Sequence, residues 1–108
     1  MKIQRALGAA AVVAALAAPA ASEDQPAAPA PRKLDVGQLF ATICGFCHAS
    51  GGRAAGHGPQ LMDTARSDDF IRNRIKNGKE GAMPAFGKTF SDSDIDQIIA
   101  YIRALQPN

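Results

Sequence analysis

The residues best suited to chemistry are two cysteines, Cys44 and Cys47, and the histidine that follows them, His48. They include both cysteines of the 108-residue chain. The pattern C-x-x-C-H is the attachment signature of a c-type haem. On a helical segment the three side chains share one face, because they lie at positions i, i+3 and i+4. We therefore predict that Cys44 and Cys47 form thioethers with the two vinyl groups of one haem c, and that His48 is the proximal ligand of its iron.

Three other kinds of site use cysteines at this spacing, and each fits the chain less well. A thioredoxin-like redox motif follows a strand in a βαβ unit, a pattern that the sequence does not show. A zinc site needs four ligands, and the chain offers only Cys44, Cys47, His48 and His57, two of which are adjacent. A disulfide across so short a loop is strained and leaves His48 without a role. Haem attachment is the interpretation that uses all three groups.

The second axial ligand has three candidates, Met62, Met83 and His57, and the position could also be left open. Met83 directly precedes Pro84, and a stiff loop holds a thioether at low entropic cost. Met62 follows Leu61, in a place where methionine more often fills core space. His57 lies between two glycines, which is typical of a solvated loop. We predict Met83 as the distal ligand and keep Met62 and His57 as the alternatives.

The N-terminus has the order of regions of a secretory signal peptide. Lys2 and Arg5 precede an apolar run at 6–18, and a small-residue segment follows, where we expect cleavage after residue 20, 21 or 22. The alternative is an uncleaved membrane anchor, but the run is short and mostly alanine. Haem attachment to C-x-x-C-H takes place on the export side of bacteria, in an oxidising compartment. The prediction is a signal peptide at 1–22 and a periplasmic protein without stable membrane insertion.

The chain that remains after cleavage is short and formally neutral. Loss of Lys2 and Arg5 reduces the twelve basic residues to ten, which equals the number of acidic residues. Nothing in this balance indicates nucleic-acid binding. Residues 23–33 are rich in proline and alanine and predict an extended linker or tail. Residues 34–108 are predicted to form one domain, whose small core a buried haem would stabilise.

Capping residues predict where the first two helices begin. Asp35 is a good N-cap with Gln38 three residues later, and this helix leads into the C-x-x-C-H motif. Ser67 is the N-cap of a second helix, which has two aspartates in its first turn and stops at Gly78. The apolar positions are Leu39, Phe40 and Ile43 in the first helix and Phe70, Ile71 and Ile75 in the second.

The third helix has the clearest signal. Ser91 and Asp94 form a capping-box pattern, and Pro107 is predicted to end the helix. Its apolar residues recur at helical spacing: Ile95, Ile98, Ile99, Ile102 and Leu105. No segment alternates with period two, so we expect no sheet, and the glycine-rich segments 50–58 and 78–87 are predicted loops. The prediction is an all-α fold of three to four helices wrapped around one covalently attached haem.

Together these segments resemble a class I c-type cytochrome of the small bacterial, single-haem kind, over residues 35–105. The matching segments are CGFCH at 44–48, GPQL at 58–61, MPAFG at 83–87 and IIAYI at 98–102. The resemblance implies the cytochrome c fold, with Cys44 and Cys47 as thioether residues, His48 as proximal ligand and Met83 as distal ligand. It also implies that the carbonyl oxygen of Pro59 accepts a hydrogen bond from Nδ1–H of His48, which fixes the tautomer.

The resemblance also bears on the crossing of the first and last helices. Phe40 and Tyr101 match the aromatic contact that the family makes there. One position departs from the family pattern, because Val36, followed by Gly37, stands where a glycine is usual, eight residues before the first cysteine. This departure predicts a helix crossing that is wider or shifted.

The function predicted from these features is electron transport. With both axial positions filled by protein, the iron has no open site for a substrate, and a soft thioether raises its reduction potential relative to bis-histidine ligation. We predict a periplasmic one-electron carrier, not an enzyme, that docks weakly and transiently on a redox donor and a redox acceptor through a small surface. One alternative is a gas- or peroxide-reactive haem protein from which Met83 dissociates. Another is a tethered cytochrome subunit of a periplasmic dehydrogenase or oxidase, with residues 23–33 as the tether.

Overall fold

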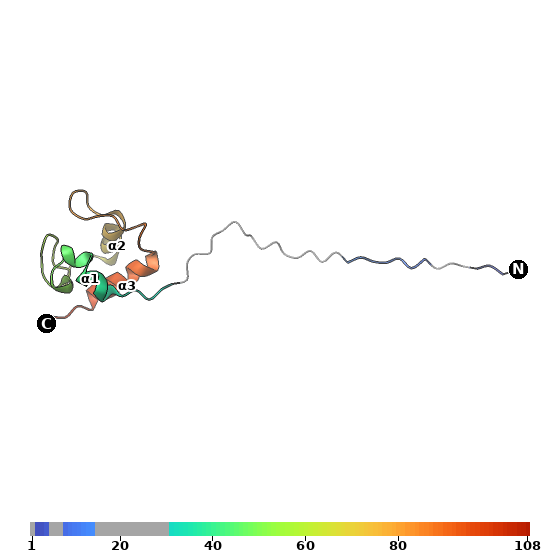
Figure 1. Cartoon of the computed structure of the whole chain (residues 1–108), viewed down its shortest axis with the longest axis horizontal. Helices are drawn as coiled ribbons and strands as arrows, with labels where there is room; N and C mark the ends of the chain where they lie inside the picture. The colour runs from blue at the N-terminus through green and yellow to red at the C-terminus, as the bar shows by residue number, and fades with distance from the viewer. Residues whose placement is uncertain (1, 5–7, 15–30) are drawn as a thin grey trace.

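The computed structural model describes residues 2–4, 8–14 and 31–108, and residues 31–108 form the folded part (Figure 1). The predicted cleavage zone at 20–22 and nearly all of the predicted linker at 23–33 lie outside the described residues. In the described part of the N-terminal segment, residues 2–4 and 8–14 are exposed and form no helix or strand. Among the helices that the structure describes, none is both long enough and apolar enough to cross a membrane.

Three α-helices make up the folded part: α1 (Val36–Ala41), α2 (Asp68–Asn77) and α3 (Asp92–Arg103). Two short 3₁₀ turns, η1 (Cys44–Phe46) and η2 (Ser50–Gly52), lie between α1 and α2. Over residues 31–108 the only β-type pairing is an isolated bridge between Lys79 and Met83. The predicted all-α fold is therefore confirmed.

Helix α3 begins as predicted and ends earlier than predicted. The Ser91 hydroxyl accepts a hydrogen bond from the Asp94 N–H, and the Asp94 carboxylate accepts one from the Ser91 N–H, which completes the capping box. The helix ends at Arg103, so the prediction that Pro107 ends it was wrong. The N–H of Ala104 reaches the carbonyls of both Ala100 and Tyr101, so the last turn tightens before the proline is reached.

The first two helices also begin at their predicted caps. The Asp35 carboxylate accepts a hydrogen bond from the Gln38 N–H, and the Ser67 hydroxyl accepts one from the Phe70 N–H. Helix α2 ends at Asn77 and is capped, as predicted, by Gly78, whose φ of 66° suits glycine. Helix α1 is shorter than predicted: it ends at Ala41, because Thr42 leaves the helical conformation. The C-x-x-C-H motif therefore begins a separate turn instead of continuing α1.

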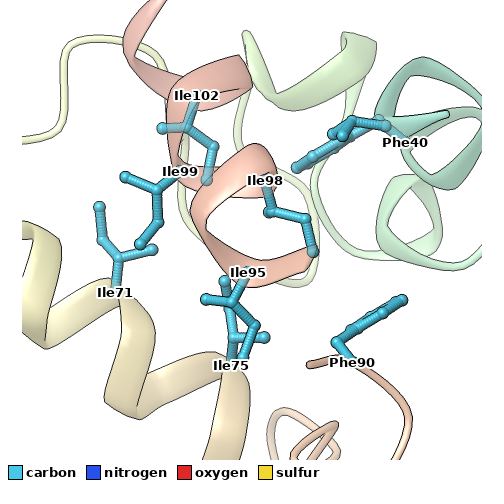
Figure 2. Close-up of a cluster of buried hydrophobic side chains, with 9 residues drawn as sticks. Phe40, Ile71, Ile75, Phe90, Ile95, Ile98, Ile99 and Ile102 are labelled. Carbon is cyan, nitrogen blue, oxygen red and sulfur yellow. The ribbon is translucent and has the colours of Figure 1, made fainter. Parts of the chain in front are cut away.

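The core forms around α3. Figure 2 shows the isoleucines of α3 between Ile71 and Ile75 of α2 on one side and Phe40 of α1 on the other. Phe40 stacks on Tyr101 with ring centroids 4.7 Å apart, which confirms the predicted aromatic contact. The buried apolar residues are Val36, Phe40, Ile71, Ile75, Phe90, Ile95, Ile98, Ile99, Ile102 and Leu105. Two predicted apolar positions are not in the core, since Ile43 is 54% exposed and Phe70 is half-buried.

Val36 fills the position where the family usually has glycine. Its side chain is buried in the core cluster, whereas Gly37 is exposed. A Cβ atom added to Gly37 would meet nothing closer than 3.6 Å, so this glycine does not mark a close helix contact. The α1 side of the core is therefore filled by a valine side chain at this position.

Residues 32–34 are attached to α3 by four hydrogen bonds. The Arg32 guanidinium donates to both carboxylate oxygens of Asp94, at 3.1 and 2.9 Å. The Gln97 side chain donates to the Arg32 carbonyl and accepts from the Leu34 N–H, each at 2.8 Å. Because Asp94 also belongs to the capping box, one buried carboxylate connects the start of the folded part to the start of α3.

The hydrogen bonds to Asp94 predict a pH-dependent stability. The pKa of Asp94 lies below its ordinary value, mainly because of the hydrogen bond from Arg32 and next because of the Ser91 N–H. A lowered folded-state pKa stabilises the protein above the unfolded-state pKa of about 3.9, and this contribution is lost as the pH falls. At about pH 7 we expect Asp94→Asn to unfold at a lower concentration of guanidinium chloride than the wild type. Near pH 3 the unfolding midpoints of the two proteins should differ less.

Far-ultraviolet circular dichroism at both pH values measures this difference. Asp63→Asn is the matched control, because Asp63 is exposed and has a φ of 60°, which asparagine tolerates. An equal loss of stability at the two pH values would show that Asp94 acts through packing and not through its charge.

Candidate haem site

The C-x-x-C-H residues lie on one helical turn. The Cys44 carbonyl accepts hydrogen bonds from the N–H groups of both Cys47, at 3.2 Å, and His48, at 2.9 Å. The side chains of Cys44, Cys47 and His48 therefore leave the backbone at the i, i+3 and i+4 positions of a single turn. Both cysteines are half-buried free thiols, and burial raises the pKa of Cys44.

A glycine allows this turn to pack against α1. A Cβ atom on Gly45 would clash with the carbonyl oxygen of Phe40, so a larger residue would force the turn away from the helix. The next residue, Phe46, points outward and is 80% exposed. Its ring stacks on His57 with centroids 6.2 Å apart. The two residues between the cysteines thus differ in role: one permits close packing and the other presents an aromatic side chain to solvent.

The ring of His48 is held by the loop that contains Gly58 and Pro59. Its Nδ1 atom lies 2.8 Å from the Pro59 carbonyl oxygen, the distance of a hydrogen bond in which Nδ1–H donates. A Cβ atom on Gly58 would lie 2.7 to 3.2 Å from three ring atoms of His48. The Gly58 N–H also donates to the Cys47 carbonyl, at 2.9 Å. This tautomer leaves Nε2 free to bind a metal.

The close approach of Gly58 predicts a large effect from a single methyl group. We expect Gly58→Ala to displace either the His48 ring or the Pro59 carbonyl, because the added Cβ would overlap the ring. The measured result would be less haem incorporated per chain and a shifted Soret band in the protein that is recovered. Gly37→Ala is the control, since its Cβ has free space on the exposed side of α1. Normal haem content and an unshifted spectrum in Gly58→Ala would contradict this account of the ring's position.

Met83 lies in a loop that is fixed to the end of α2. The backbones of Lys79 and Met83 exchange two hydrogen bonds of 2.8 Å. Beyond Met83, the Phe86 N–H donates to the Ile75 carbonyl at 2.8 Å, which returns the chain to α2. The Met83 side chain is half-buried against the core cluster, and Cys44 packs against the same cluster. The loop and the C-x-x-C-H turn are thus positioned by one core.

The alternative axial ligands differ from Met83 in their surroundings. Met62 is half-buried, and its N–H donates to the Gly52 carbonyl at 3.0 Å. His57 is exposed and contacts Phe46, as expected for a residue of a solvated loop. Among the residues that the structure describes, no group of three or more His, Cys, Asp or Glu side chains is placed to hold a metal ion. This result gives no support to the zinc alternative.

Two contacts of the site were not predicted from the sequence. The close approach of Gly58 to the His48 ring is one of them, although the glycine-proline pair predicts the contact with Pro59. The Tyr101 hydroxyl donates to the Gly51 carbonyl at 2.9 Å, which ties α3 to the loop after the haem motif. The sequence predicts only an aromatic contact for Tyr101, because no local signal pairs it with a residue fifty positions away.

These residues fit a c-type haem by the chemistry of their donor groups. Two free thiols and an imidazole leave one turn, the imidazole is oriented by Pro59, and a half-buried thioether lies in a fixed loop. Comparison with known proteins decides the family. The model of the family described as cytochrome c oxidase, cbb3-type, subunit III matches residues 32–102. This chain belongs to the c-type cytochromes.

Relatives of this cytochrome carry the name cytochrome c6. The protein from Gracilaria tenuistipitata var. liui is 40% identical over 76 residues, which cover 64% of this chain and 69% of the relative. A protein from a Synechococcus species is 34% identical over 63% of this chain and 65% of its own length. The protein from Bryopsis maxima is 32% identical over 64% of this chain and 88% of its own length. The matches thus span about two thirds of the first two relatives. No solved structure gives a significant match.

Family membership confirms several of the predictions. The chain is a small, single-haem class I c-type cytochrome with an all-α fold and one covalently bound haem c. The cytochrome c6 relatives also bear out the prediction of a one-electron carrier that is not an enzyme. The individual ligands, the compartment and the partners stay predictions.

Proposed function

We propose that this cytochrome is a periplasmic one-electron carrier whose iron is held by His48 and Met83. The observation that carries the proposal is the contact of 2.8 Å between His48 Nδ1 and the Pro59 carbonyl, which presents Nε2 as a ligand. The Met83 loop supports it, because Met83 exchanges two backbone hydrogen bonds with Lys79 and the following Phe86 N–H donates to the Ile75 carbonyl of α2. Two donors held by backbone contacts would move little between oxidation states.

The role of each residue follows from its chemistry. Bound haem would supply one iron centre that alternates between Fe(III) and Fe(II). Cys44 and Cys47 would anchor the group covalently, and the hydrogen bond from His48 to Pro59 would raise the basicity of the imidazole. The thioether of Met83 is a soft ligand that favours the reduced state and therefore a higher reduction potential.

The proposed compartment rests on sequence features alone. The basic, apolar and small-residue regions of 1–22 follow the order of a signal peptide, and C-x-x-C-H attachment suits an oxidising compartment. We place 23–33 as a linker or tail ahead of the haem domain. Partners would be a redox donor and a redox acceptor that bind transiently. Ile43, directly before the C-x-x-C-H motif, is 54% exposed, and Phe46, within the motif, is 80% exposed, so both offer apolar contact for such docking.

Carbon monoxide tests this proposal against the gas-reactive alternative. The haem-loaded protein, expressed with its signal sequence and purified from the periplasm, would be reduced and mixed with carbon monoxide in a stopped-flow spectrometer. A carrier with Met83 bound should show no rapid change of the reduced spectrum, because the sixth position is filled. Rapid formation of a carbonyl complex by the native protein would favour a haem with an open or labile site.

A further inference from the structure

Two arginines contact the same aromatic ring on α2. The guanidinium carbon of Arg66 lies 4.5 Å from the centroid of the Phe70 ring, and that of Arg74 lies 5.1 Å from it. Phe70 and Arg74 lie one turn apart on α2, and Arg66 lies just before the Ser67 N-cap, so the two guanidinium groups approach one ring from the start of the helix and from its next turn. Arg66 is exposed, and Phe70 and Arg74 are half-buried. We call these three residues the arginine–phenylalanine surface.

No ion pair within the folded part engages the two arginines of this surface. The neighbouring basic residues are paired: Arg72 with Asp69 and Asp96, Lys76 with Asp92, and Arg103 with Asp68. Over residues 31–108, by contrast, no carboxylate lies within ion-pair distance of Arg66 or Arg74. Two guanidinium groups therefore remain available for external carboxylates, which they bind in a bidentate manner.

The surface is held in place before any partner binds. Arg103 of α3 donates hydrogen bonds to the Asp68 carboxylate at 2.9 Å, to the Thr64 carbonyl at 3.0 Å and to the Arg66 carbonyl. These contacts fix the backbone that carries Arg66. The buried isoleucines of α2, Ile71 and Ile75, face α3 and fix the helix itself (Figure 2). A preformed surface loses less conformational entropy when a partner docks.

We propose that the arginine–phenylalanine surface docks an acidic segment of a protein partner. Carboxylates of that segment would pair with Arg66 and Arg74, and its apolar atoms would cover the Phe70 ring. A membrane fits less well, because attraction to anionic lipid uses clusters of four to eight basic residues. Here the surface has only two basic residues, and the exposed aspartates Asp63, Asp68 and Asp69 lie beside them in the chain. The proposal rests on the carrier function only in naming a protein as the partner.

Binding of an oligoglutamate peptide to the ¹⁵N-labelled, haem-loaded, reduced protein tests the proposal. At low ionic strength we expect amide shifts at residues 64–74. The double variant Arg66→Gln/Arg74→Gln should weaken binding by about fivefold or more, the loss of two exposed ion pairs. Arg66→Lys/Arg74→Lys should keep part of the affinity, because lysine retains the charge but not the bidentate contacts of the guanidinium groups. The control Lys33→Gln/Lys88→Gln removes the same charge at two exposed lysines and should bind nearly as wild type.

Three results would overturn the proposal. If the two Gln double variants lost the same amount of affinity for the peptide, binding would depend only on the net charge of the protein. Shifts centred on residues 79–88 would place anion binding on the methionine loop. Binding to phosphatidylglycerol vesicles without binding to the peptide would assign the surface to a membrane. Because the readout is peptide binding, it is independent of the carbon monoxide result, so failure of this proposal and failure of the carrier function are distinguishable.

Discussion

Replacing both cysteines should abolish covalent haem attachment. We expect Cys44→Ala and Cys47→Ala each to lose one thioether, and the double variant to lose its haem on acid-acetone extraction, because one remaining thioether still holds the haem covalently. The effect should reach the fold, because a chain of this size has a small core and a group that binds only the folded state contributes its binding energy to folding. Helix content measured by circular dichroism should therefore fall together with haem content.

The exposed residue Ala55 provides a control in the loop that follows the motif. Ala55→Ser should retain both haem and helix content. If the double variant Cys44→Ala/Cys47→Ala kept all its haem through extraction, the assignment of Cys44 and Cys47 as attachment residues would be wrong.

Replacing Met83 should leave the haem attached and change its electronic state. Met83→Ala removes the thioether but neither thiol nor His48, so covalent haem should be retained. The ferric spectrum should become high-spin or show an external ligand. The reduction potential should fall on the order of 0.1 V, within the range of about 0.8 V that axial ligands span. Optical spectra and a redox titration measure both effects.

Met62→Ala is the matched control for the ligand assignment. Met62 is also a half-buried methionine in the same domain, and its substitution should leave the spectrum and the potential nearly unchanged. A vacant sixth site in Met62→Ala with a normal spectrum in Met83→Ala would reverse the assignment.

Helix starts could be predicted from the sequence because caps are local. Asp35, Ser67 and Ser91 each accept a hydrogen bond from the N–H three residues later, and short-range spacing is sufficient to indicate this. Helix ends were harder to predict. Helix α1 stops at Ala41 and α3 at Arg103, although apolar residues at Ile43 and Leu105 continue the pattern. An apolar residue that continues a periodic pattern does not show where the helix stops.

Contacts distant in the sequence account for what could not be predicted. Arg32 and Asp94 are 62 residues apart, and nothing near either residue indicates their pairing. The chemistry of the site could be predicted because Cys44, Cys47 and His48 lie within five consecutive residues. The loop position of Gly58 against the His48 ring required the fold. Charge balance has the same limit, because twelve basic and ten acidic residues do not indicate which arginines form ion pairs in the fold and which, like Arg66 and Arg74, do not.

The most direct test of the central claim is the optical spectrum of the protein expressed in the periplasm and extracted with acid-acetone to remove loose haem. His48 and Met83 ligation predicts sharp α and β bands after reduction and a weak sulfur-to-iron band in the oxidised form. Haem that resists extraction but lacks the sulfur-to-iron band would contradict Met83 as the distal ligand, and with it the carrier proposed here.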